Sequence, residues 1–221
     1  MQEIDPRFPE RIRPLWASLN GEVVWLHARW IIYRQLYGTS AERVELLNQS
    51  AGSFFHHLQD ILLHNVQLGL AKLSDPATSG RQHNLSLDAL HQGLVDIGEH
   101  SAATILKTSI SSFKEACKAV RQRRNKWIAH LARDTMLKRD VTPLIGPARS
   151  EIEAALATLR ESMNCVSLFF ANTTTAYEYF GMQADGEALM RDLRRAARYK
   201  ELVEEGTIPR SDYRIRFKGE K

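Results

Sequence analysis

The chain has 221 residues, of which 43% are hydrophobic and 25% charged, and its formal net charge is +4. These proportions are those of an ordinary globular protein and exclude a disordered or fibrous chain. Two cysteines, Cys117 and Cys165, are too few for a disulfide scaffold, which favours a reducing, cytoplasmic location. No run of about 18 apolar residues predicts a membrane span, and the acidic N-terminus predicts no secretory signal.

Apolar residues at helical spacing predict helices along most of the chain. The first helix is expected over residues 10–37, with Gly38 at its end. The second is expected over residues 41–73. It should end before Ser74-Asp75-Pro76, because proline disfavours the helical conformation in the residue before it.

The same periodicity continues after a polar loop at residues 77–85. Ser86 is expected to cap a short helix that ends near Ile97. Longer helices are predicted over residues 101–137 and 148–180, with Pro147 suited to the start of the second of these. A last helix should open at Asp185 and continue to about Glu205.

Four long helices joined mostly by short turns predict an all-α fold, an up-down helical bundle with shorter helices and a C-terminal extension. We expect the bundle in residues 1–182 and a C-terminal helix with a basic tail in residues 183–221, packed on the bundle or extending from it. The tail alternates apolar and basic residues over 213–217, which fits an arm that binds RNA, docks on a neighbour or stays disordered.

Positive charge is concentrated in residues 114–139, which hold nine bases and two acids. This excess favours an anionic partner such as nucleic acid. The alternative is a basic face that is simply solvated.

Arg124 interrupts an apolar seam in the same segment. The seam follows a 4-3-4-3 spacing and consists of Leu106, Ile110, Phe113, Cys117, Val120, Trp127 and Leu131. On an unbroken helix Arg124 would lie on the packed face, where a guanidinium needs a carboxylate, an anionic ligand or a wet cleft. A satisfied structural ion pair, or an arginine that reaches the bundle edge, would explain it equally well.

His130 follows Arg124 by six residues, which places the two side chains roughly 120° apart on an ideal helix. They would meet only if the arginine reaches around, the helix distorts, or a second copy of the chain brings its own pair. Arg123, Lys126 and Asp134 share the face of His130, and Asp134 is placed to orient the imidazole.

Arg124, Asn125 and His130, with five residues between the arginine and the histidine, resemble the motif of the HEPN superfamily. A second stretch, residues 70–76 followed by residues 84–87, resembles the branch related to the abortive-infection protein AbiU. The likeness covers about residues 20–180.

This resemblance implies a homodimer whose two motifs meet in a shared cleft, and a metal-independent endoribonuclease that needs no cofactor. It further implies that His130 transfers a proton, that Arg124 stabilises charge on phosphorus, and that Asn125 holds the phosphate or positions the other two. The expected RNA-backbone contacts are Arg121, Arg123, Lys126 and Arg133. Phage defence, or a toxin with a separate antitoxin protein, is the implied role.

Other interpretations remain open. One is a non-catalytic helical module that binds RNA or protein and uses Arg124 in a structural ion pair. His56, Asp60 and His64 share a helix face that could hold a divalent ion, although we expect no metal there. The remaining candidates are expected in the core or at the surface: in the core Cys117, Trp25, Trp30, Phe54, Phe55, Phe169 and Phe170, and at the surface His83, His91 and His100.

Overall fold

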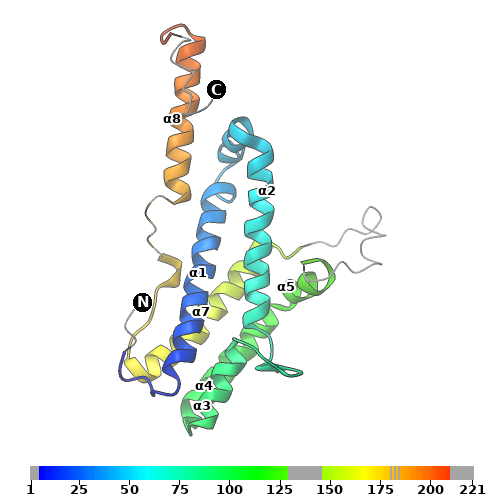
Figure 1. Cartoon of the computed structure of the whole chain (residues 1–221), viewed down its shortest axis with the longest axis vertical. Helices are drawn as coiled ribbons and strands as arrows, with labels where there is room; N and C mark the ends of the chain where they lie inside the picture. The colour runs from blue at the N-terminus through cyan, green and yellow to red at the C-terminus, as the bar shows by residue number, and fades with distance from the viewer. Residues whose placement is uncertain (1–4, 129–145, 180, 182, 184, 210–221) are drawn as a thin grey trace. The chain divides into compact units, whose positions relative to one another are not determined.

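The computed structural model describes residues 5–128, 146–179, 181, 183 and 185–209, and these are almost entirely helical (Figure 1). The all-α prediction is therefore confirmed. The helices are α1 (Arg13–Tyr37), α2 (Ala41–Leu73), α3 (Leu87–Asp96), α4 (His100–Ala116), α5 (Lys118–Arg123), the π-helix η1 (Arg124–Ile128), α7 (Arg149–Ala171), the 3₁₀ helix η2 (Tyr177–Tyr179) and α8 (Gly186–Glu204). Two short strands, β1 (Thr78–Ser79) and β2 (Gln82–His83), pair antiparallel in the loop after α2.

The chain forms two compact units, Met1–Trp30 with Leu62–Phe180, and Ile31–Ile61 with Gly181–Lys221. In the first unit α4 packs along both α3 and α7. The predicted seam forms its core, since the side chains of Leu106, Phe113 and Val120 are fully buried.

The second unit has its own small core. Leu36, Leu47, Phe55 and Met190 are buried against one another, which joins the end of α1 and the start of α2 to α8. Polar contacts reinforce this packing: Arg43 donates to both carboxylate oxygens of Glu187 at 2.6 and 2.9 Å.

Several predicted helix ends are confirmed. The first helix ends at Tyr37, followed by Gly38, and α2 ends one residue before Ser74. Ser86 and Asp185 cap α3 and α8, each accepting a hydrogen bond from a backbone N–H of the first turn.

Other details differ from the sequence-based expectation. The helix predicted over 148–180 ends at Ala171, because Asn172 adopts a left-handed conformation with φ 51° and closes it. The helix predicted over 101–137 is interrupted at Cys117, whose φ and ψ of −82° and 1° lie outside the helical region. Pro147 lies outside α7 rather than in its first turn.

The aromatic side chains are divided between core and surface. Trp30 and Phe55 are buried, as expected. Trp25, Phe54 and Phe169 are 56%, 62% and 42% exposed, so their assignment to the core is wrong. Helical spacing places a residue on a face, but it does not say whether another element covers that face. No helix in the described ranges combines the length and apolar character needed to cross a membrane.

Candidate functional site

The backbone changes its helical form where the arginine–histidine motif begins. After the interruption at Cys117, α5 runs for six residues and passes directly into the π-helix that starts at Arg124. Wider π turns are rare and are frequent at functional sites. The ideal α-helical angle per residue therefore does not apply to residues 124–128.

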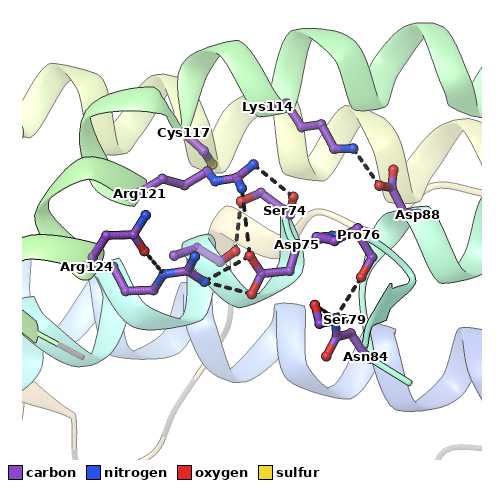
Figure 2. Close-up of polar contacts among 12 residues, drawn as sticks. Ser74, Asp75, Pro76, Ser79, Asn84, Asp88, Lys114, Cys117, Arg121 and Arg124 are labelled. Atoms are coloured by element: carbon purple, nitrogen blue, oxygen red, sulfur yellow. Dashed lines mark hydrogen bonds and ion pairs between the residues drawn. The ribbon is translucent and has the colours of Figure 1, made fainter. Parts of the chain in front are cut away.

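Arg124 is held by two neighbours. Its Nη1 donates to both carboxylate oxygens of Asp75 at 2.9 and 2.7 Å (Figure 2). Its Nε donates to Oδ1 of Asn125 at 2.9 Å. The two side chains of the ion pair are 16% and 21% exposed. The carboxylate predicted as one possible partner of this seam position is thus present.

The end of α2 presents Asp75 to the arginine. Ser74 is buried and its hydroxyl donates to the carbonyl of Ala71, which fixes the last turn of the helix. Arg121 lies beside the same turn, with Nη1 3.4 Å from the carbonyl of Ser74 and Nη2 4.0 Å from Asp75 (Figure 2). Two segments 49 residues apart, each part of the family resemblance, therefore meet at this ion pair.

A pocket of about 530 Å³ opens beside the ion pair. Within the described part of the chain, no hydrogen bond uses Nη2 of Arg124. Two nitrogens of the guanidinium, Nε and Nη1, are thus held by Asn125 and Asp75, and Nη2 can donate to a further anion. The pocket is lined by Leu68, Lys72, Asp75, Gln82, His83, Asn84, Leu85, Arg124 and Asn125.

The β1–β2 hairpin forms one wall of this pocket. Gly80 turns the chain with φ +61°, a conformation that suits glycine. Asn84 ties the hairpin to the end of α2, since its Nδ2 donates to the carbonyl of Pro76 and to the hydroxyl of Ser79 (Figure 2). This bracing brings Gln82 and His83 to the pocket, in a segment that the sequence predicted only as a polar loop.

The structure brings together some of the predicted site residues. Arg124 and Asn125 line the pocket, and Arg121 lies next to Asp75. Arg123 is half-buried and Lys126 is exposed. His130, Arg133 and Asp134 lie outside the described residues.

Sequence reasoning missed Asp75, Lys72 and His83 as members of the site. Asp75 and Lys72 stand in the stretch quoted for the AbiU likeness, which was the available signal. His83 is exposed, as expected, but it also lines the pocket.

The other candidate sites do not gain support from their geometry. His56 and His57 are exposed with ring centroids 6.0 Å apart. No group of three or more His, Cys, Asp or Glu side chains suited to a metal occurs in the portion that the structure describes. Cys117 is buried and desolvation raises the pKa of its thiol to about 12, which makes it a poor nucleophile at neutral pH.

Comparison with protein-family models matches residues 11–190 to the family described as AbiU2, a HEPN family. The matched range includes Asp75, Arg124 and the histidine of the motif. None of the curated proteins and none of the solved structures matches the chain.

Proposed function

Because the chain belongs to the AbiU2 family of HEPN domains, we propose that it is an endoribonuclease that cleaves RNA without a metal ion. The ribose 2′-hydroxyl attacks the neighbouring phosphorus, and the bond from phosphorus to the 5′-oxygen breaks. The products are a 2′,3′-cyclic phosphate and a 5′-hydroxyl. DNA lacks the attacking group and is not cleaved.

The orientation of Arg124 is the observation that carries the proposal. Charge develops on the phosphoryl oxygens during the attack, and a cation held in place beforehand stabilises it without reorganising. Asp75 and Asn125 hold two nitrogens of the guanidinium, and Nη2 has no hydrogen-bond partner among the described residues. A phosphate in the pocket would complete the set of bonds.

The 2′-hydroxyl loses a proton as it attacks, and the departing 5′-oxygen gains one. We assign this proton transfer to His130, because an imidazole titrates near neutral pH. Asp134 orients that ring. Asn125 has the donor to hold a phosphate oxygen once its own Oδ1 has accepted from Arg124. The basic residues around the motif bind the RNA backbone: Arg121, Arg123, Lys126 and Arg133.

The decisive experiment incubates the protein with single-stranded RNA in EDTA and identifies the new ends. We expect 2′,3′-cyclic phosphates from the wild type and a loss of at least about 100-fold in rate for Arg124→Ala and for His130→Ala. Arg149→Ala and His57→Ala, which change exposed residues that are not in the pocket lining, serve as matched controls. Equal rates in all five proteins, or cleavage of matched DNA, would disprove the assignment.

A non-catalytic binding module is the second candidate, and the ion pair favours it. A carboxylate that accepts both hydrogen bonds of Nη1 gives Arg124 a structural partner without any substrate. In that case Arg124→Ala lowers the melting temperature, and neither motif variant changes the RNA products.

We further propose that the protein acts in the cytoplasm as a homodimer in defence against phage, with its activity restrained by a separate antitoxin protein. Family membership supports the link to abortive infection. The dimer is what the resemblance to HEPN domains implies, with the two copies of the motif in one cleft.

A further inference from the structure

We propose that two adjoining pockets of the first unit hold two consecutive nucleotides of single-stranded RNA, and that Lys72 binds the phosphate that joins them. The identity of the ligand as RNA rests on the proposed function. The placement of the two nucleotides rests on the two pockets and on Lys72, which is not part of the arginine–histidine motif.

The pocket beside Arg124 does not stand alone. A second pocket of about 250 Å³ lies between α1 and the end of α2 and is lined by Glu22, Leu26, Arg29, Gly69, Lys72, Leu73 and Leu85. The two pockets share Lys72 and Leu85, so they meet at these two side chains. The larger volume lies within the range of small-ligand sites, roughly 300–1,000 Å³, and the smaller lies just below it.

Lys72 is suited to a phosphate at the junction. Its side chain is exposed and enters no ion pair in the described part of the chain. Arg124 stands in one pocket and Arg29 in the other, so a cation is available on either side of Lys72. Asp75, which is paired with Arg124, and Glu22, which lines the second pocket, oppose these cations, so the two linings together hold three cations and two carboxylates. Because the cations are divided between two adjoining pockets, a ligand with more than one phosphate can contact more of them than a single small anion can.

The hairpin wall supplies groups that read a base. Gln82 offers an amide and His83 an imidazole, and neither side chain makes a hydrogen bond to another described residue. Leu68 and Leu85 give the same pocket apolar surface, and Leu85 is 39% exposed. Unstacked bases are recognised by contacts of these two kinds, to the ring face and to the hydrogen-bonding edge. The larger pocket therefore receives a base next to the phosphate that Arg124 binds.

The first test measures the binding of a short, fluorescently labelled 2′-fluoro RNA, which cannot be cleaved because it lacks the attacking hydroxyl. Lys72→Ala should weaken binding about tenfold. It should also reduce the slope of log K against log salt by about 0.7, the value for one lost phosphate contact on a single strand. Lys72→Arg should keep most of the affinity and most of the salt slope of the wild type. Lys107→Ala, an exposed lysine of the same unit that lines neither pocket, is the matched control.

The second test measures base preference with the four homopolymeric 2′-fluoro RNAs. Gln82→Ala should reduce the spread of the four dissociation constants at least about threefold while leaving the salt slope unchanged, because an amide reads the base and not the phosphate. Equal effects of Lys72→Ala and Lys107→Ala, or an unchanged base preference in Gln82→Ala, would overturn the two-nucleotide site.

The two proposals fail in different ways. A protein that binds 2′-fluoro RNA through Lys72 but never cleaves RNA contradicts the nuclease activity and keeps the nucleotide site. A protein that cleaves RNA with Lys72→Ala and Gln82→Ala behaving as wild type keeps the activity and disproves the site. The two-nucleotide site is also disproved if an acidic peptide displaces the labelled RNA while Lys72→Ala leaves the affinity for RNA unchanged.

Discussion

Asp75 has two effects on Arg124 that oppose each other. The carboxylate offsets the cost of a guanidinium that is only 16% exposed, and it fixes the direction in which the guanidinium points. It also neutralises part of the charge that a phosphate would otherwise meet. Because the carboxylate engages Nη1 alone, orientation is gained while Nη2 stays available in the pocket.

We expect a strong energetic coupling between these two side chains. Asp75→Asn and Arg124→Gln should each lower the free energy of unfolding by about 2 kcal/mol. Each variant leaves the other member of the ion pair partly buried and without an opposite charge. The double-mutant cycle in urea should give a coupling of about 1–2 kcal/mol. The exposed pair Glu115 and Lys118 provides the control cycle, for which less than about 0.5 kcal/mol is expected. Equal coupling energies in the two cycles would show that the Asp75–Arg124 contact is no stronger than an exposed ion pair.

His27 is a second residue whose environment determines its protonation. The ring is 2% exposed, its Nδ1 lies 2.8 Å from the carbonyl of Val23, and its Nε2 lies 3.5 Å from Nη1 of Arg160. The pKa of His27 is lowered to about 4, chiefly because burial removes the ring from water and also because Arg160 is positively charged, while the hydrogen bond to Val23 and the charge of Glu178 act in the opposite direction. The folded protein therefore keeps this imidazole neutral.

The free energy of unfolding should depend on pH through His27. Between pH 6.5 and about 4 the unfolded chain binds a proton at this residue and the folded chain does not, so stability falls as the pH falls. The loss attributable to the ring reaches roughly 3 kcal/mol at the acidic end.

Urea unfolding at a series of pH values measures this effect. The difference in free energy of unfolding between the wild type and His27→Gln should shrink as the pH is lowered from 7 to 4. His57→Gln, at an exposed position, should follow the wild type throughout. A constant difference between the wild type and His27→Gln would contradict the assigned protonation state.

At the scale of the elements, the apolar periodicity predicted most of what the structure shows. Its seam from Leu106 to Val120 is buried, and helix ends marked by Gly38, Ser86 and Asp185 were visible because each has a local chemical cause. The apolar spacing does not mark every local departure from the helix. Ala51, inside α2, takes φ −158° and ψ 66°, and nothing in its residue type indicates this kink.

The sequence likewise predicted some features of the candidate site and missed others. The position of Arg124 in the seam predicted that it needs a partner, because burial of one helix face follows from spacing. The identity of that partner did not follow, since Asp75 is 49 residues away and the contact depends on how two helices pack. The hairpin wall was missed for a related reason: strands of two residues are too short to show a period.

The cap of α3 gives an element-scale prediction next to the pocket. Ser86 is fully buried and its hydroxyl accepts from the N–H of Ala89 at 3.3 Å. Ser86→Ala should lower the free energy of unfolding by about 1 kcal/mol, the usual loss for a helix cap. Ser111→Ala, at an exposed position inside α4, should change it by less than about 0.5 kcal/mol. Equal values for the two variants would mean that the cap does not stabilise α3.

On the scale of the whole molecule, the site belongs to one of the two units. Its pocket draws on the end of α2, the hairpin and the start of η1, all within the unit of residues 1–30 and 62–180. The family match nevertheless runs from residue 11 to residue 190, and so reaches into α8 of the other unit. The family match thus includes the second unit, although none of that unit's described residues lines the pocket beside Arg124.

The proposed dimer leads to a prediction about mixed proteins. If Arg124 of one copy works with His130 of the other, a dimer of one Arg124→Ala chain and one His130→Ala chain contains one complete site and one that lacks both groups. Random exchange makes half of the dimers mixed, so an equal mixture of the two inactive variants should recover about a quarter of the wild-type rate. If both groups act from the same chain, no dimer in the mixture has a complete site and the rate stays at the level of the separate variants.

A matched control distinguishes complementation between two chains from a gain in activity that arises only because one variant stabilises the other. Arg124→Ala mixed with the double variant Arg124→Ala, His130→Ala contains no arginine at the motif in any dimer, and it should remain inactive. Subunit exchange is checked by light scattering and by pull-down with differently tagged copies. Exchange without any recovery of RNA cleavage would place the arginine and histidine of each site on one chain, and the dimer would then be unnecessary for catalysis.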